Sequence, residues 1–235
     1  MKRTLIILLS ALLALSPAVA QKLPEPSFYH PSIAVGGRLG ASLSFLDIRP
    51  SINQGIHYGG LAGASFQIEN SPYTGAELSL MYALRGWTEA YPDAEEPLAY
   101  SCYLHCVNLP LSLMLYYPFG NFRMGLKAGP SIGAIFAVRA KQSGDAFPEE
   151  DALRHKLPVV GRFTWGVAAG PYFSYSFGKH RIELDGRFYY SFNNLFSAKL
   201  GDVYARSAEM VVEVTAAYLF RVYCCLLYTS PSPRD

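Results

Sequence analysis

The sequence contains little charge and few cysteines for its 235 residues. Charged residues make up 16% of the chain, with 20 Lys and Arg against 18 Asp and Glu, and there are 4 cysteines. Beyond the N-terminal segment, no apolar run reaches the length of about 18 residues that marks a transmembrane helix. The composition therefore argues against a helical membrane domain there. Hydrophobic residues still make up 51% of the chain, including 17 Tyr and 14 Phe.

The N-terminal segment has the pattern of a signal peptide. Lys2 and Arg3 precede an apolar run from Leu5 to Leu15, and an Ala18-Val19-Ala20 site follows. The apolar run is short for a membrane anchor, so we expect residues 1–20 to be removed on export.

The C-terminal residues 224–235 resemble the translation of a sequencing-library adapter, and we expect them to be an artefact. The expected domain is then 21–223. Without Lys2, Arg3 and Arg234 it keeps 17 basic residues, and without Asp235 it keeps 17 acidic residues. This neutral balance gives no reason to expect nucleic acid as a partner.

Two cysteines, Cys102 and Cys106, lie within the expected domain. Four residues along a regular strand span about 13 Å, which is too far for a disulfide. A disulfide between them would need a bend in the chain, so the sequence leaves their pairing open.

Apolar and polar residues alternate with a period of two along much of the domain. From Val107 to Tyr117, every second residue is Val, Leu or Tyr. This period predicts strands with one apolar face and one polar face. Turn residues divide the domain into eight such strands, expected at Ser32–Asp47, His57–Asn70, Thr74–Glu89, Tyr100–Pro118, Phe122–Lys141, Val159–Gly178, His180–Lys199 and Ala208–Tyr223.

The connections between these strands alternate in length. Those at 70–73, 119–121 and 178–180 are short, whereas those at 49–55, 91–98, 142–158 and 200–206 are longer and more polar. Short turns at one rim and long loops at the other are typical of outer-membrane barrels.

The apolar face is large, aromatic and nearly free of charge. In a soluble barrel this face would be inside, and in a membrane barrel it faces lipid. The sequence therefore predicts an all-β fold, an eight-stranded antiparallel up-and-down transmembrane β-barrel in the outer membrane. We expect the long loops to lie outside the cell and an aromatic girdle near the short turns, formed by Tyr116, Tyr117, Phe119, Phe122, Tyr175 and Phe177.

The polar face carries charges of both signs. Eight strands enclose an interior just wide enough for side chains to fill it, and an unpaired charge there is costly. We therefore predict a filled lumen with a structural charge network, and a narrow ion or proton path is the alternative. The predicted members are Arg38, Glu77, Arg85, Arg123, Lys127, Arg162, Glu183, Asp185, Arg187 and Glu213.

The sequence lacks motifs that indicate a known catalytic or ligand-binding chemistry. The sequence has no Gly-x-Ser-x-Gly, phosphate-binding loop or His-Glu-x-x-His. Ser101 and His105 share one face of a strand, which leaves a lipid-modifying enzyme as an alternative, but such common residues are weak grounds for it. The acidic residues in 142–158 lack the spacing of a calcium loop. We expect no enzyme activity, no cofactor and no metal.

Four motifs suggest a family. They are Glu77-x4-Tyr82-x3-Gly86, Val107-Asn108-Leu109-Pro110-Leu111 after Tyr103, Ala128-Gly129-Pro130-x2-Gly133, and Arg187-Phe188-Tyr189-Tyr190-Ser191 before Asn193-Asn194. In this order, over roughly 32–223, the chain resembles the PorT-type outer-membrane β-barrel proteins. Leu104-His105-Cys106 departs from the pattern, where an acidic residue is expected.

The resemblance implies the fold and the location in the outer membrane, but it implies little about activity. We expect a structural or interaction role. The expected partners are outer-membrane lipid, the machinery that inserts barrels, and proteins at the outer loops or periplasmic turns. Because one branch of the family takes part in protein secretion, an accessory role in secretion across the outer membrane is the alternative.

A membrane barrel should show heat-modifiable migration in gel electrophoresis. We expect protein extracted in mild detergent to migrate differently before and after boiling, because a closed barrel resists unfolding by the gel detergent. Recovery as a soluble periplasmic monomer that unfolds reversibly in urea would contradict the membrane assignment.

Overall fold

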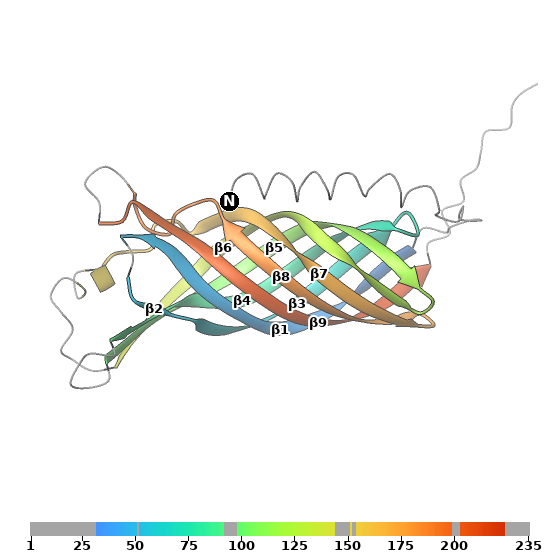
Figure 1. Ribbon diagram of the computed structural model, residues 1–235, viewed down its shortest axis with the longest axis horizontal. Coiled ribbons are helices and arrows are strands. Elements are labelled where there is room, and N and C mark those ends of the chain that lie inside the picture. Colours follow the sequence, from blue (N-terminus) through green and yellow to red (C-terminus); the bar gives the residue numbers. More distant parts are fainter. Residues whose placement is uncertain are drawn as a thin grey trace, which may run out of the picture.

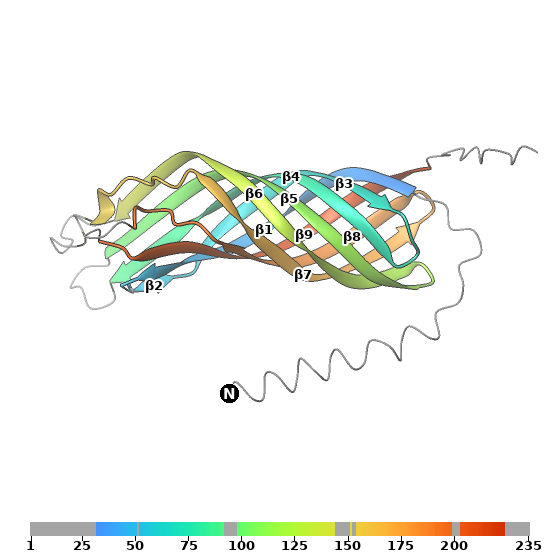
Figure 2. The same cartoon turned by 90° about the horizontal axis from the view of Figure 1, so that it is seen from above.

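Eight long antiparallel strands close into a barrel in the described part of the chain (Figures 1 and 2). The computed structural model describes residues 32–50, 52–91, 98–143, 151, 154–198 and 203–223. The strands are β1 (Ser32–Arg49), β3 (His57–Glu69), β4 (Thr74–Tyr91), β5 (Leu98–Phe119), β6 (Phe122–Ser143), β7 (Phe163–Phe177), β8 (His180–Ser191) and β9 (Arg206–Tyr223). The short β2 (Gln54–Gly55) pairs with the end of β4.

Each long strand pairs with its neighbours in chain order, and the first strand pairs with the last. The β1–β9 ladder runs from Ser32 opposite Tyr223 to Arg49 opposite Arg206. This ladder closes the ring and leaves no free sheet edge, as the polar backbone of a membrane barrel requires. The predicted eight-stranded antiparallel barrel is confirmed.

The two ends of the barrel differ, as the connection lengths predicted (Figure 1). Two-residue turns join β5 to β6 and β7 to β8, and their first residues, Gly120 and Gly178, have φ angles of 62° and 60°. Glycine adopts this left-handed conformation without steric cost. Ser32 and Tyr223 lie at this same end, the short-turn end, and the strand ends that border the longer connections, such as Arg49 and Arg206, lie at the opposite end, the long-connection end.

The wall of the barrel separates polar from apolar side chains. Along β5, Val107, Leu109, Leu111, Leu113 and Leu115 are exposed on the outside, while the residues between them are buried inside. The predicted alternation therefore describes this strand, with the apolar face outward.

Aromatic side chains border the apolar outer face near the short turns. Tyr117 contacts Phe119, and Tyr175 contacts both Phe122 and Phe177, with ring centroids 4.7 to 6.1 Å apart. Tyr116, which we had expected in this girdle, lies inside instead, because its even-numbered position faces the lumen. Its hydroxyl donates a hydrogen bond to the Ser71 carbonyl at 2.8 Å.

A second aromatic group lies towards the long-connection end. The rings of Tyr82, His105 and Phe136 lie 5.9 to 6.2 Å from one another, and Trp165 contacts Phe192. Aromatic girdles on both sides of an apolar band match the two interfaces of a bilayer. Because about 9–11 residues per strand cross a membrane, the 22 residues of β5 and of β6 extend well beyond this band.

A β-bulge at Phe136 reverses which side chains of β6 point into the lumen. Before it, Ile135 pairs with the inward Cys106, and after it, Val138 pairs with the inward Leu104. Phe136 is the extra residue and faces outward. Inward residues are therefore odd-numbered up to Ile135 and even-numbered from Val138 onwards, so that Val138 and Ala140 line the end of the lumen.

Two predicted strand boundaries were wrong. β7 begins at Phe163 rather than Val159, and β8 ends at Ser191 rather than Lys199. After β8, the amide side chain of Asn193 bonds the backbone of Trp165 and Phe163, and Asn194 accepts a hydrogen bond from the Ser207 amide. These bonds turn the chain inward, so that Leu195 and Phe196 are buried in the end of the barrel.

Residues 1–20 and 224–235, expected to be a signal peptide and an artefact, lie outside the described residues. In the part of the chain that the structure describes, no helix has the length and apolar character needed to cross a membrane.

Gly86 is a position where any side chain should destabilise the barrel. Its φ angle is 151°, and an added Cβ would lie 1.8 Å from the Cys102 carbonyl oxygen. We expect Gly86→Ala to lower the free energy of unfolding by about 2 kcal/mol or more, through backbone strain and displacement of β5. Urea titration of the refolded barrel in lipid vesicles measures this.

The matched control is Gly37→Ala, because an added Cβ there approaches no atom closer than 4.0 Å. Equal stability of the two variants would contradict the assigned strain.

Candidate functional site

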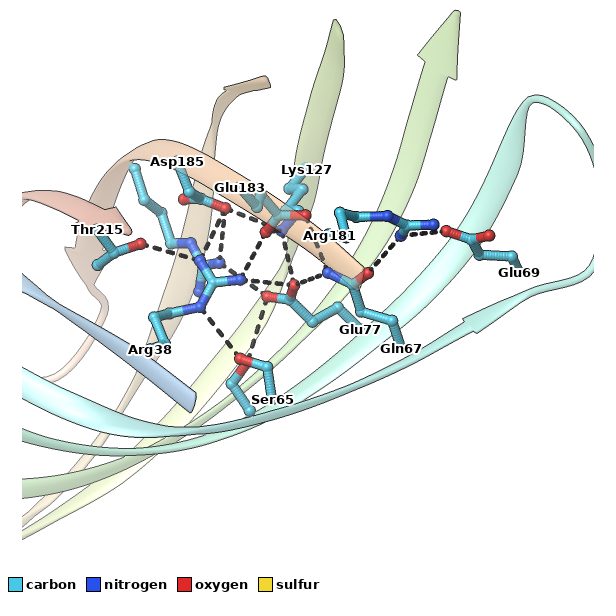
Figure 3. Close-up of polar contacts among 12 residues, drawn as sticks. Arg38, Ser65, Gln67, Glu69, Glu77, Lys127, Arg181, Glu183, Asp185 and Thr215 are labelled. Atoms are coloured by element: carbon cyan, nitrogen blue, oxygen red, sulfur yellow. Dashed lines mark hydrogen bonds and ion pairs between the residues drawn. The ribbon is translucent and has the colours of Figure 1, made fainter. Parts of the chain in front are cut away.

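A charge cluster fills the lumen in the half of the barrel nearer the short turns, and Figure 3 shows its polar contacts. Arg38 contacts Glu77 at 2.8 Å, Glu183 at 2.7 Å and Asp185 at 3.1 Å. Lys127 contacts the same three carboxylates, at 2.6 Å from Glu77 and 3.0 Å from Asp185. Arg187 completes the cluster with Glu77 and Asp185 at 3.1 and 3.3 Å. We call these six residues the central cluster, in which three cations balance three carboxylates.

The central cluster joins opposite walls of the barrel. In the ring order, β1 lies opposite β6 and β4 lies opposite β8. Arg38 and Lys127 therefore reach the axis from one pair of opposite walls, and Glu77 and Glu183 from the other pair. All four side chains are at most 3% exposed. The cluster thus connects four walls across the lumen with buried side chains.

Neutral polar groups complete the hydrogen bonding of the central cluster. Arg38 donates to the hydroxyls of Ser65 and Thr215 at 3.1 and 2.9 Å. The Gln67 amide donates to Glu77 at 2.7 Å and to Glu183 at 3.1 Å. Such bonds offset part of the desolvation cost of buried ions.

A second group lies towards the short turns and is centred on Glu69. Its carboxylate contacts Arg181 and lies 2.7 Å from Arg123 and 2.9 Å from the Ser32 hydroxyl. Arg181 also donates to the Gln67 amide oxygen, which links this group to the central cluster (Figure 3).

A third group lies on the other side of the central cluster. Arg85 pairs with Glu213 at 2.8 Å and lies over the Tyr189 ring, 4.6 Å from its centroid. Glu209, on the same inward face of β9 as Glu213, is also buried. Across the three groups, six basic and six acidic side chains are buried or nearly so, and the three groups together are formally neutral.

Towards the long connections, the lumen becomes apolar. An apolar cluster of eleven buried residues includes Leu46, Trp87, Tyr100, Leu104 and Phe196. Cys102 and Cys106 belong to it, and both are buried free thiols. The interior therefore changes along the axis from paired charges to packed aromatic and aliphatic side chains.

A pocket of about 280 Å³ lies over this apolar cluster at the long-connection end. At its base, the Glu89 carboxylate accepts hydrogen bonds from the Trp87 indole at 3.0 Å and interacts with His155 at 3.1 Å. Tyr204 also lines the pocket, and burial raises the pKa of its hydroxyl above the usual value. We call this the outer pocket, which combines aromatic walls with charged groups.

The structure brings together nine of the ten side chains predicted for the interior network. The central cluster holds Arg38, Glu77, Lys127, Glu183, Asp185 and Arg187, while Arg123 lies in the Glu69 group and Arg85 and Glu213 in the third group. Arg162 is placed elsewhere: it is exposed and precedes β7, because that strand begins one residue later.

Sequence reasoning omitted four interior residues from the network, Gln67, Glu69, Arg181 and Glu209. The strand period indicates the inward face for them, because residues an even number of positions apart in a strand share a face. Gln67 and Glu69 lie on the face of Ser65, Arg181 on that of Glu183, and Glu209 on that of Glu213.

Ser101 and His105, the two residues considered as a possible catalytic pair, form hydrogen bonds with different partners. Ser101 and His105 face outward on β5, where Ser101 lies 3.3 Å from the Thr88 hydroxyl and His105 lies 2.7 Å from the Tyr82 hydroxyl. Among the described residues, no three His, Cys, Asp or Glu side chains form a group that could hold a metal ion.

Comparison with known families decides the assignment. A profile described as "Outer membrane protein beta-barrel domain" matches residues 19–197. The chain belongs to this family. The protein is therefore an outer membrane β-barrel protein, in agreement with the apolar outer face of the wall. A search of curated proteins finds no match.

Solved structures similar to this outer membrane protein include three bacterial barrels. OprG from Pseudomonas aeruginosa is 12% identical, with 83% of this chain and 97% of that chain covered and a TM-score of 0.48. Ail of Yersinia pestis, solved with the heparin analogue sucrose octasulfate, is 9% identical, covering 80% and 99%, with a TM-score of 0.38. Neisserial surface protein A is 11% identical, covering 83% and 100%, with a TM-score of 0.39. Because the sequence identities and TM-scores are this low, none of the three structures informs the function of this chain.

Removing one charge from the central cluster should destabilise the barrel strongly. Glu183→Gln leaves Arg38 and Lys127 short of a carboxylate in a buried site, and we expect a loss of about 3–5 kcal/mol in the free energy of unfolding. The double variant Lys127→Met/Glu183→Gln restores the charge balance and should be less destabilised than Glu183→Gln alone. Urea unfolding in lipid vesicles measures both.

The surface pair of Asp47 and Arg206, at 2.8 Å with side chains 24% and 41% exposed, provides the control. Asp47→Asn should cost less than about 1 kcal/mol. If Glu183→Gln cost no more than this control, the balanced charges would not be a main source of stability.

Proposed function

We propose that this outer membrane protein is a non-conducting barrel that acts through its long-connection end, as a structural or interaction protein. The single observation that carries the proposal is the filled lumen, in which the central cluster joins opposite walls and the apolar cluster closes the end above it. A barrel of this kind offers its loops as a surface and offers no water-filled path.

Within the outer-membrane barrel family, we propose that the chain belongs to the PorT-type branch. The motifs that support this lie on inward and outward positions of four strands. Glu77 and Arg187 of these motifs meet in the central cluster, where their atoms lie 3.1 Å apart. The motif ending in Asn193-Asn194 supplies the amides that turn the chain after β8.

An accessory role in secretion is the second candidate, and only the resemblance favours it. Deletion of the gene followed by analysis of secreted proteins separates the two roles. Secretion defects that the wild-type gene rescues would support the accessory role, whereas normal secretion would support the structural or interaction role.

We further propose that the protein is not an enzyme. The separate partners of Ser101 and His105 support this proposal, since a catalytic pair needs a hydrogen bond between nucleophile and base. Ser101→Ala and His105→Ala should leave the lipid A of the producing cells unchanged in mass spectrometry. Altered lipid A in either strain would contradict the proposal.

The filled lumen should prevent ion conduction. We expect the purified barrel in a planar lipid bilayer to show no steady conductance above that of bare lipid, because paired side chains occupy the axis. A porin with an open lumen serves as the positive control. Stable, reproducible conductance steps from the folded barrel would overturn the non-conducting proposal.

A further inference from the structure

The outer pocket has the size of a binding site for one small ring compound. Its volume of about 280 Å³ is just below the range of about 300–1,000 Å³ that holds drug-sized ligands. It is lined by the ends of β4, β5 and β6, by the segment before β7, and by Phe196 and Tyr204. Ligand pockets are typically apolar with a few placed polar groups, and this lining has both features.

Aromatic side chains form the walls of the outer pocket. The Tyr100 and His155 rings stack with centroids 3.7 Å apart and planes 5° apart. Trp87 meets Phe196 edge to face at 5.6 Å, and Phe196 lies 5.1 Å from Tyr204. Flat aromatic ligands pack against such walls by stacking and edge contacts. The walls therefore favour a planar ring over a branched or strongly hydrated molecule.

The charges of the lining favour an anion. Glu89 supplies the negative charge. One of its carboxylate oxygens already interacts with Trp87 and the other with His155. Arg154 and Arg162 supply two positive charges. Arg154 pairs with Asp151 at 3.2 Å, whereas Arg162 is exposed and forms no ion pair with any described residue. An arginine with an open guanidinium can bind a carboxylate through two parallel hydrogen bonds.

We propose that the outer pocket binds a small aromatic carboxylate, with the ring against Trp87, Tyr100 and Phe196 and the carboxylate on Arg162. The other charged and titratable groups that line the pocket are Glu89, Arg154, His155, Tyr100, Tyr204 and Cys102. Glu89 interacts with His155 and Arg154 with Asp151, so Arg162 is the charge offered to a ligand. This inference goes beyond the structural role, because it assigns a ligand class to the long-connection end.

The protein offers an internal probe for this site. It has two tryptophans: Trp87 lines the outer pocket, and Trp165 is 49% exposed on the outer wall. In a Trp165→Phe variant, tryptophan fluorescence reports on Trp87 alone. Full-length barrel in lipid nanodiscs is titrated with benzoate. We expect a saturable change in Trp87 fluorescence with half-saturation at about 1 mM or below, as suits a ligand of this size.

Three probes related to benzoate separate the contributions of ring and charge. Benzyl alcohol keeps the ring without the charge, benzylamine reverses the charge, and acetate keeps the charge without the ring. We expect benzoate to bind at least about fivefold more tightly than each of them. Binding of benzylamine that is as tight as that of benzoate, or tighter, would overturn the anion assignment. Saturable binding of acetate over the concentration range used for benzoate would overturn the role of the aromatic walls.

Variants in the same Trp165→Phe background locate the site. Arg162→Gln should weaken benzoate binding about tenfold, the size expected for one charge-assisted interaction. The matched control, Arg139→Gln, removes an exposed arginine on the outer side of β6 and should leave binding unchanged. Ala140→Phe fills the pocket and should abolish the response.

Unchanged heat-modifiable migration shows that each variant still forms a barrel. Absence of any saturable response in the folded parent, or an equal effect of Arg139→Gln and Arg162→Gln, would refute the proposed site.

Discussion

The structure depends on the meeting of opposite charges at the barrel axis. Lipid outside the wall excludes charged side chains, and eight strands leave a narrow interior, so charges on the polar face are stabilised by partners across a short distance. The central cluster satisfies this constraint with three cations and three carboxylates from β1, β4, β6 and β8. Because no two of these strands are neighbours in the ring, the ion pairs act as cross-braces between walls that share no backbone hydrogen bonds.

The side chains that fill the barrel change in character along its axis. The apolar band with its aromatic borders fixes the height of the barrel in the bilayer, and the central cluster and the Glu69 group lie within the portion nearer the short turns. Beyond the third group, the lumen is filled by the apolar cluster, and the longer ends of β5 and β6 carry the outer pocket. The paired charges and the outer pocket are therefore located in different parts of one continuous interior.

The sequence predicted most of the wall because each strand has a period of two and lipid requires one face to be apolar. Leu109 and Ser112 could be assigned to opposite faces from parity alone, and the same parity indicated that Arg38 and Glu77 point inward. It could not indicate that these two side chains meet, since contacts across the lumen depend on the stagger and tilt of strands that are far apart in sequence.

The remaining errors have local causes. Ala134-Ile135-Phe136-Ala137-Val138 is uniformly apolar, so no polar residue marks the bulge that reverses the facing of β6. The end of β8 was misplaced because Phe192 continues the alternation, whereas the Asn193 and Asn194 side chains redirect the backbone. The outer pocket was not predicted because it combines strand ends with the segment 154–162, whose position depends on tertiary contacts.

The pairing of Arg38 with Glu77, Glu183 and Asp185 also constrains how the chain enters the membrane. Its partners on β8 are separated from β1 by more than half of the sequence, and Arg38 contacts them only when the sheet curves fully. An open sheet lying in lipid would present these ions to hydrocarbon. The folding reaction should therefore be cooperative, with formation of the β1–β9 seam and neutralisation of the interior occurring in one concerted step.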